Sequence, residues 1–232
     1  MIEIRPFASL GHANHGWLDA RHHFSFANYY EPSRMGWGPL RVWNDDAIAA
    51  KSGFPPHPHR DMEIITYVRE GAISHRDSLG NEGRTAAGDV QVMSAGTGIT
   101  HAEFNQEDAE TRLFQIWIEP REGGGQPRWD ARPFPRDDRS GRWTVLASGY
   151  DNDNDALAID ADARIAGILL PKGESVSWSL AKGASAYLVP ATGSLEVNGQ
   201  TAATRDGVAV RDEDEIRLTA LEDAEVLLVE TG

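Results

Sequence analysis

Two short segments of the chain carry the residues best suited to bind a metal ion. One contains His57 and His59, two residues apart, and the other contains His101 and Glu103 with the same spacing. In an extended strand successive side chains point to opposite faces, so each pair shares a face. If the two strands are neighbours, three imidazoles and one carboxylate meet at one point. The spacing therefore predicts a site for one divalent transition metal.

The chemistry of these ligands narrows the choice of metal without deciding it. Three imidazoles and a carboxylate suit Fe, Mn, Co, Ni, Cu or Zn better than Mg or Ca. The chain has no cysteine, so no thiolate is present to select zinc or Cu(I). Three or four protein ligands leave one or two coordination positions open, which is typical of a catalytic site and not of a closed structural one.

All eight histidines lie in the first 101 residues. Apart from the three in the metal-binding segments, they are not expected to bind the metal. His12 and His15 are three apart, a poor ligand spacing on a strand, so they are expected to be structural or to line an entrance. His22 and His23 point opposite ways in an extended chain, so at most one of them can face a pocket. His75 is expected to be exposed to solvent.

The elements that must position these residues are strands. Short β-branched and aromatic runs occur at 64–68, 90–93 and 113–118, each bounded by Gly, Pro or a charged residue. Val176–Leu180 alternates strictly, and Asn198-Gly199 is a strong hairpin signal because both residues accept a positive φ. The aromatic residues Phe24, Phe26, Tyr29 and Tyr30 are expected to pack in the core or against the N-terminal segment and not to bind a cofactor. Many short strands without a helical period predict an all-β sandwich or barrel.

The chain is predicted to form two domains, 1–135 and 136–232. The stretch REGGGQPRWDARPFPRDDRSGR between the two halves is rich in Gly, Pro and Arg and is typical of a linker. The halves also resemble each other weakly. Registering Gly71 on Gly193 places Ser179 and Ala181 where the first domain has its HxH pair. The second domain is therefore predicted to keep the scaffold without the metal ligands.

The composition excludes several classes of function. The net charge is −14, and no basic run is present, so direct binding to nucleic acid is disfavoured. No apolar run approaches the about 20 residues that span a bilayer. The first residues lack the basic start and apolar core of a secretion signal. With no cysteine available for disulfides, we expect a soluble, cytoplasmic protein.

The motifs also carry a family resemblance. Gly53, HxH, Glu63 and Gly71 resemble the first motif of the cupin superfamily, and Gly88, Gly96, His101 and Asn105 resemble the second. More narrowly, GHANHGWLDARHHFSFANYY, RVWNDD, HPHRDMEIITYV, SAGTGITHAEFN and QIWIEP resemble bacterial pirin-like proteins of the bicupin type. The resemblance implies an all-β bicupin, with two tandem cupin-type β-barrel or jelly-roll domains.

The resemblance also implies a ligand set. A metal, for which the family favours iron, would be held by His57, His59, His101 and Glu103. In many other cupins the fourth ligand is the Glu after HxH, here Glu63, and strand parity permits either choice. The pirin pattern favours Glu103, in which case Glu63 would orient an imidazole through its free N–H.

The function implied by the resemblance is that of quercetin 2,3-dioxygenases, which open a flavonol ring with O₂ and release carbon monoxide. Glu103 would take the proton of the flavonol 3-hydroxyl. Two alternatives stay open. One is a metal- or redox-sensing regulatory protein that contacts a protein partner, and the other is a cupin enzyme acting on another small substrate. Apolar pocket walls would favour a flavonol, whereas converging Arg or Lys side chains would favour an anion.

Overall fold

The structure is a computed structural model that describes all 232 residues. It consists almost entirely of strands, with short 3-10 turns at η1 (Phe7–Ser9), η2 (Pro32–Arg34) and η3 (Arg136–Arg139). The all-β prediction is confirmed. No helix is long and apolar enough to cross a membrane. The chain divides into two compact units, one of residues 11–134 and 157–161 and the other of residues 1–10, 135–156 and 162–232.

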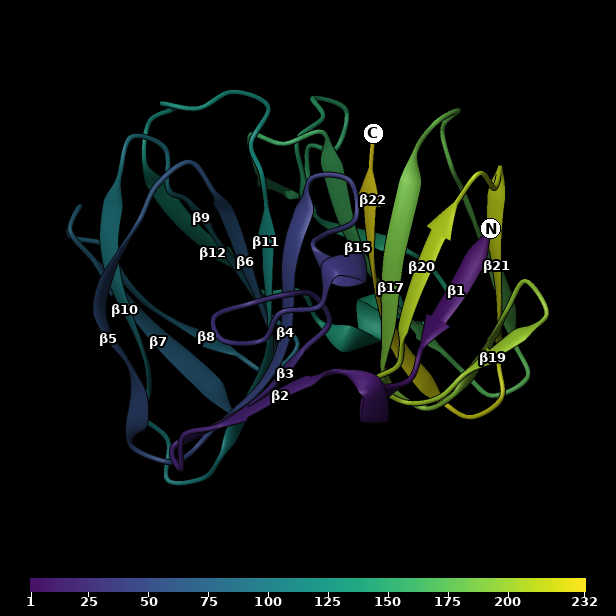
Figure 1. The fold of residues 1–232 in the computed structure, drawn as a ribbon, viewed down its shortest axis with the longest axis horizontal. Coiled ribbons are helices and arrows are strands. Elements are labelled where there is room, and N and C mark those ends of the chain that lie inside the picture. Colours follow the sequence, from purple (N-terminus) through teal and green to yellow (C-terminus); the bar gives the residue numbers. More distant parts are fainter. The chain divides into compact units, whose positions relative to one another are not determined.

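The unit of residues 11–134 is built from two antiparallel sheets (Figure 1). The larger sheet has the order β12-β9-β6-β11-β4-β3-β2, with β2 at Gly11–Asn14, β3 at Leu18–His22, β4 at Leu40–Ile48, β6 at Glu63–Glu70, β9 at Val90–Ser94, β11 at Thr111–Ile118 and β12 at Arg128–Arg132. The smaller sheet has the order β5-β10-β7-β8, with β5 at Ser52–His59, β7 at Ala72–Asp77, β8 at Glu82–Ala86 and β10 at Ile99–Asn105. The short strand β14 (Leu157–Ala158) belongs to the second segment of this unit.

The core of this unit is divided between apolar and polar side chains. A cluster of buried aliphatic residues joins both sheets, and it contains Leu18, Ala20, Ile48, Val68, Ile73 and Leu113. Trp17 and Phe54 pack against this cluster, with their rings edge to face at 5.0 Å. Further along the same strands the buried side chains become polar. Because burial of polar groups costs free energy unless they are paired, this polar part of the core marks the candidate site.

The second unit repeats this plan. Its larger sheet contains, in spatial order, β1 (Ile2–Arg5), β20 (Gly207–Arg211), β17 (Ser185–Thr192), β22 (Ala224–Thr231), β15 (Ala163–Leu170) and β13 (Thr144–Ser148). Its smaller sheet contains β16 (Ser175–Ser179), β21 (Glu215–Ala220), β18 (Leu195–Val197) and β19 (Gln200–Ala202). The order β16-β21-β18-β19 repeats β5-β10-β7-β8, element for element. The interior is filled by one cluster of buried aliphatic side chains, and no group of metal-binding side chains occurs in this unit.

The boundary between the units differs in part from the predicted domains 1–135 and 136–232. The main division falls between Phe134 and Pro135, beside the predicted boundary. The first ten residues, however, belong to the second unit, because β1 pairs with β20 from Ile2↔Val210 to Arg5↔Gly207. An edge strand presents unpaired backbone groups, and β1 covers those of β20, as the purple and yellow-green arrows show in Figure 1.

Candidate metal centre

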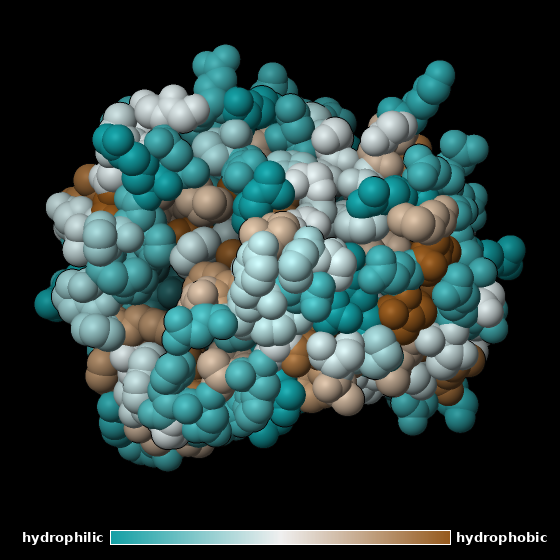
Figure 2. Space-filling model, in the orientation of Figure 1, coloured by the Kyte–Doolittle hydropathy of each residue, from teal (hydrophilic) through white to brown (hydrophobic).

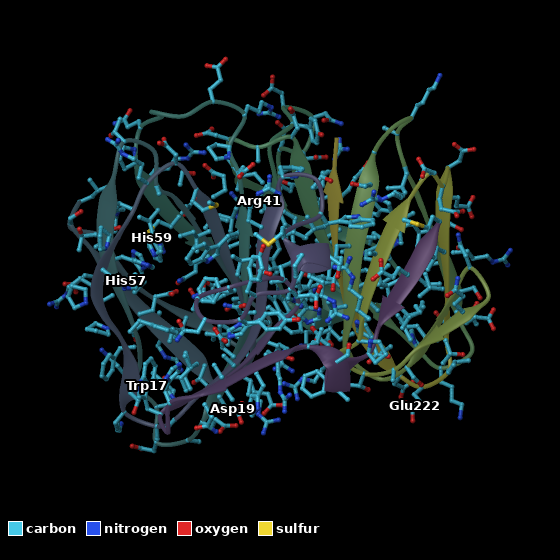
Figure 3. All side chains as sticks on the ribbon, in the orientation of Figure 1. Trp17, Asp19, Arg41, His57, His59 and Glu222 are labelled. Atoms are coloured by element: carbon cyan, nitrogen blue, oxygen red, sulfur yellow. The ribbon has the colours of Figure 1, made fainter.

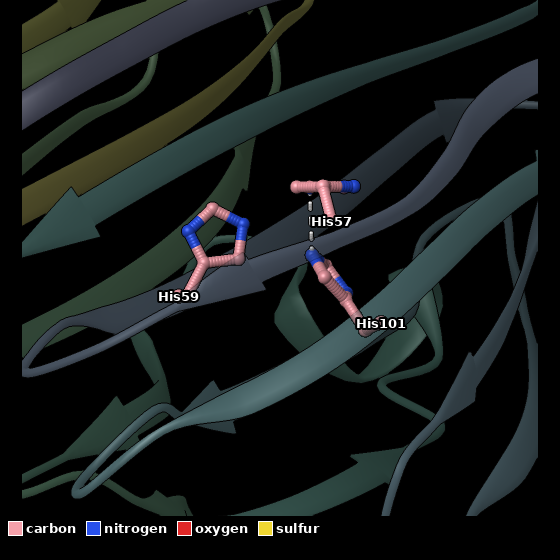
Figure 4. Close-up of side chains that lie close together, drawn as sticks. All are labelled: His57, His59 and His101. Carbon is pink, nitrogen blue, oxygen red and sulfur yellow. Dashed lines mark hydrogen bonds between the residues drawn. The ribbon is translucent and has the colours of Figure 1, made fainter.

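Strands β5 and β10 bring three imidazoles together. The two strands pair antiparallel, and His57 lies directly opposite His101. The ring centroids of His57 and His101 are 4.5 Å apart, and His59 completes a triangle with distances of 4.8 Å to His57 and 4.9 Å to His101. Figure 3 shows His57 and His59 side by side, and Figure 4 shows all three rings converging. The structure thus brings together the three histidines that the spacing predicts.

The nitrogen atoms of two of these rings are arranged to receive a cation. The Nε2 atoms of His57 and His101 face each other at 3.1 Å (Figure 4). The Nδ1 atom of His57 lies 2.8 Å from the carbonyl oxygen of Pro55, which only a protonated Nδ1 can satisfy. In the neutral ring the lone pair of His57 is then on Nε2. Two nitrogens that bind the same ion at about 2.1 Å are about 3 Å apart, so the spacing fits a shared metal.

Burial keeps two of the imidazoles in the form that binds metal. The pKa of His59 is lowered to about 4 by burial and by the nearby His57. The pKa of His101 is lowered to about 2 by burial and by the neighbouring histidines. A metal binds the neutral imidazole. His59 and His101 are therefore ready to act as ligands at neutral pH without first losing a proton.

Glu103 lies beside His101 in a buried network of amides. One carboxylate oxygen accepts hydrogen bonds from Gln91 Nε2 at 2.7 Å and from Thr66 Oγ1 at 3.2 Å, and the other accepts one from Gln115 Nε2. Burial raises the pKa of Glu103 to about 7, although these three hydrogen bonds act in the opposite direction. A carboxyl group with this pKa can both accept and return a proton near neutral pH.

The two candidates for the fourth ligand differ in position. A carboxylate oxygen of Glu103 lies within 4.8 Å of a ring nitrogen of His101. Glu63 is also buried, but its carboxylate accepts a hydrogen bond from Ser94 Oγ at 2.6 Å, and its other close charges are Asp160 and Arg128. Parity along the chain does not carry from β5 to β6, because the chain turns between them, where Asp61 has a φ of 46°. The hydrogen bond of the Glu63 carboxylate thus goes to Ser94 and not to one of the three imidazoles, and its role as a ligand or as a partner of an imidazole stays a prediction.

The histidine cluster opens onto a cavity of about 470 Å³. Phe26, Tyr29, Phe54 and Trp117 contribute aromatic rings to its walls, and no Arg or Lys lines it. The space-filling view is hollowed on this unit, with apolar side chains at the edge of the hollow (Figure 2). The prediction that the aromatic residues at 24–30 serve only for packing in the core or at the N-terminal segment is partly right, because Phe24 is buried whereas Phe26 and Tyr29 face the cavity.

The floor of the cavity contains a buried carboxyl group that sequence reasoning missed. Asp46 shares a face of β4 with Asn44, and both line the cavity. Asp46 is 2% exposed, and its Oδ1 has no hydrogen-bond partner. Burial, followed by the charges of Asp45 and Glu103, raises the pKa of Asp46 well above its usual value. The local sequence RVWNDD does not show which of Asp45 and Asp46 faces the cavity, because that depends on the register of the strand.

The remaining histidines are distributed as predicted, with one exception. His12 and His15 line the mouth of the cavity, and His22 lines its wall while the buried His23 does not. The prediction that His75 is exposed was wrong, since its side chain has no exposed surface. It lies opposite Glu103 in the β7–β10 pair, a long-range register that the local sequence does not reveal.

Comparisons with known proteins place the chain in a family. Residues 3–118 match the family model described as Pirin, and residues 145–231 match the one described as Quercetinase C-terminal cupin domain. The chain belongs to the pirin family. The prediction of two cupin domains, a bicupin, is thereby confirmed.

Relatives of this pirin match it along its whole length. A Caulobacter vibrioides protein named Pirin-like protein is 61% identical over 232 residues and covers 100% of both chains. Quercetin 2,3-dioxygenase of Escherichia coli K12 is 45% identical over 229 residues, which cover 98% of this chain and 97% of the relative. The crystal structure of the E. coli pirin YhhW in complex with nickel(II) has a TM-score of 0.94 and 43% identity, and the match covers 100% of this chain and 99% of YhhW.

Proposed function

We propose that this pirin is a metal-dependent dioxygenase that opens the ring of a flavonol such as quercetin with O₂ and releases carbon monoxide. The observation that carries the proposal is the location of the histidine cluster, which lies in the wall of a cavity whose lining includes aromatic and aliphatic side chains but no Arg or Lys. Such walls suit a flat, uncharged polyphenol. They do not suit a small anion, for which cationic side chains would converge.

In this proposal His57, His59 and His101 hold the metal, and Glu103 is the fourth ligand and the base. A bound metal of this kind acts as a Lewis acid that lowers the pKa of a coordinated hydroxyl group. Glu103 accepts the proton of the flavonol 3-hydroxyl, for which its pKa of about 7 is well matched. The amides of Gln91 and Gln115 donate hydrogen bonds to the carboxylate and hold it in place.

The apolar part of the cavity binds and orients the flavonol rings. Phe26 and Trp117 meet edge to face with their centroids 5.4 Å apart, and the ring of Trp117 lies 5.0 Å from that of His59. The aromatic wall therefore extends to the histidine cluster. A flat ring bound against it has its hydroxyl groups within reach of the histidines, and the apolar contacts exclude water from that side.

We infer that the native metal is iron, and we place the protein in the cytoplasm as part of the same proposal. The ligand set is equally compatible with the nickel(II) that the YhhW structure contains. Iron is favoured by the family resemblance, and elemental analysis of protein purified without a histidine tag tests it.

The activity is tested by incubating iron-loaded and nickel-loaded protein with quercetin under air. We expect loss of the flavonol absorbance together with release of carbon monoxide. A metal-free sample and an anaerobic sample serve as controls, and Glu103→Gln is expected to lose at least 100-fold in kcat as the base is removed. If neither metal form consumes quercetin or produces carbon monoxide, the proposed reaction is wrong, and a regulatory role or another small substrate takes its place.

A further inference from the structure

A fourth imidazole, which is fully buried, contacts His101 from the side opposite to His57. His75 projects from β7, and its Nδ1 lies 3.4 Å from Nδ1 of His101. Its Nε2 lies 3.0 Å from Oδ2 of Asp77. The side chains of His75 and Asp77 have no exposed surface. Asp77, His75 and His101 thus form a continuous chain of contacts that ends at the Nε2 atom facing His57.

The proton positions along this chain follow from the surroundings of Asp77. Its Oδ1 accepts hydrogen bonds from the backbone N–H groups of Leu79 at 2.9 Å and Asn81 at 3.1 Å. Its Oδ2 accepts one from Asn81 Nδ2 at 2.9 Å as well as the contact from His75. A carboxyl group surrounded by so many donors is ionised and acts only as an acceptor. His75 Nε2 must therefore be the donor.

The same reasoning continues to the metal site. His75 is fully buried beside another imidazole, which favours its neutral form. With the proton on Nε2, its Nδ1 carries the lone pair and can only accept. His101 Nδ1 must then be the donor, which leaves the lone pair of His101 on Nε2. His57 reaches the same tautomer through a backbone carbonyl, that of Pro55. The hydrogen bond from His101 to His75 and that from His57 to the Pro55 carbonyl thus leave both Nε2 lone pairs directed at one point.

The packing around His75 holds its ring in one orientation. The ring of Trp129 lies flat on it, with centroids 4.8 Å apart and an angle of 7° between the planes. Trp129 can lie there because residue 83 is glycine, since a Cβ at that position would come within 2.2 Å of the indole. A ring held in this orientation keeps its hydrogen bonds to both Asp77 and His101. The direction of proton donation, from His101 to His75 and from His75 to Asp77, is therefore fixed.

We propose that His75 and Asp77 are positioning residues of the metal centre, which fix the Nδ1–H tautomer of His101 so that its Nε2 faces the metal. This inference rests on the proposed metal site but not on the proposed reaction. Hydrogen-bond acceptors behind a ligating histidine orient the ring and raise its basicity, and their loss typically lowers metal affinity by about 10–100-fold.

The decisive variant is Asp77→Asn, which keeps the shape of the side chain. The backbone N–H groups of Leu79 and Asn81 cannot reverse, so the carbonyl oxygen of the introduced amide must take the place of Oδ1. Its NH₂ group then faces His75 Nε2 and donates to it, while the side-chain amide of Asn81, which donates to Oδ2 in the wild type, must turn its oxygen toward the new NH₂ group. This inverts the chain, so that His75 donates from Nδ1 and His101 carries its proton on Nε2, where it cannot bind a metal.

The second variant, His75→Phe, removes the chain but leaves His101 free to adopt either tautomer. We therefore expect Asp77→Asn to lower Ni²⁺ affinity by about 10–100-fold and His75→Phe to lower it less, although His75→Phe is the larger change in chemistry. In the double variant Asp77→Asn should have no further effect, because the residue that transmits the inversion is absent. Asp19→Asn, at the exposed Asp19–His12 pair, is the matched control and should leave affinity unchanged.

The measurements are titration calorimetry with Ni²⁺ and the visible absorption spectrum of the Co²⁺-loaded protein, which reports ligand geometry. Thermal melts of the metal-free variants check folding. The inference is overturned if Asp77→Asn binds Ni²⁺ within twofold of the wild type, or if His75→Phe loses as much affinity as Asp77→Asn, as it would if His75 were itself a ligand or a packing residue. If the wild type binds no metal, the proposed metal site is wrong. If the wild type binds Ni²⁺ and both variants bind it equally well, the metal site stands and only this inference is wrong.

Discussion

The Nε2 atoms of His57 and His101 lie 3.1 Å apart across the β5–β10 pair. The other nitrogen of each ring is engaged elsewhere, by the carbonyl of Pro55 and by His75. The two lone pairs therefore face each other. Two lone pairs at this distance repel unless a cation lies between them, so the arrangement favours the metal-bound form.

Replacing one of these rings should remove the metal. We expect His57→Ala to contain far less metal than the wild type by elemental analysis, and Ni²⁺ should no longer raise its melting temperature. In the wild type, we expect Ni²⁺ at 100 times its Kd to stabilise the fold by about 2.7 kcal/mol. His12→Ala is the matched control, because His12 is exposed at the mouth of the same cavity and pairs with Asp19. Unchanged metal content in His57→Ala would overturn the site assignment.

The pH dependence of metal binding should follow Glu103. Since the pKa values of His59 and His101 are lowered to about 4 and about 2, neither ring takes up a proton between pH 5.5 and 8. The pKa of Glu103 is raised to about 7, so below this pH a proton competes with the metal for the carboxylate. We expect the Kd for Ni²⁺ to rise roughly tenfold per pH unit below 7. Glu103→Gln should bind more weakly and lose the part of this slope that the carboxylate causes, and an equal slope in both proteins would exclude Glu103 as a ligand.

The close approach of β5 and β10 depends on a glycine. A Cβ at Gly53 would lie 2.2 Å from the carbonyl oxygen of Glu103 and 2.6 Å from the Cα of Phe104. Gly53→Ala must therefore move β5 away from β10 and disturb the pairing of the histidines. We expect a loss of about 1–3 kcal/mol in the free energy of unfolding and weaker Ni²⁺ binding. Gly125→Ala is the control, because its Cβ would meet only an ordinary contact at 3.6 Å. Wild-type Ni²⁺ affinity in Gly53→Ala would show that the strand contact is not needed.

Much of the fold follows from local sequence signals. The run at 64–68 falls in β6 and that at 113–118 in β11. Asn198 and Gly199 have φ values of 44° and 86°, as a type I′ hairpin requires. The weak repeat appears in the structure as the shared strand order of the two units. Local spacing sufficed here because each signal concerns neighbouring residues.

The rest of the site depends on contacts between distant strands. The three histidines were predictable because HxH places two rings on one face of one strand. The roles of His75 and Asp46 depend on which residue of one strand faces which residue of another, and parity along the chain cannot supply that register across a turn. For the same reason, parity alone could not decide between Glu63 and Glu103, and the hydrogen bond of Glu63 goes to Ser94.

Asp46 leads to a prediction about stability. Its pKa in the folded protein is raised well above the usual value, first by burial and then by Asp45 and Glu103. A raised carboxyl pKa means that its contribution to stability is fully present below the unfolded-state value and is lost as the pH rises through the folded-state value. Asp46→Asn keeps the shape and cannot ionise, so it should be more stable than the wild type at pH 8.

The melting temperature should rise by about 2–4 °C for each kcal/mol by which the substitution raises the free energy of unfolding. This gain should shrink as the pH falls toward 4. Thermal melts of both metal-free proteins at several pH values measure it. Asp130→Asn serves as the control, because Asp130 is exposed and should change little at any pH. A difference between Asp46→Asn and the wild type that does not grow with pH would mean that Asp46 is not held protonated in the cavity floor.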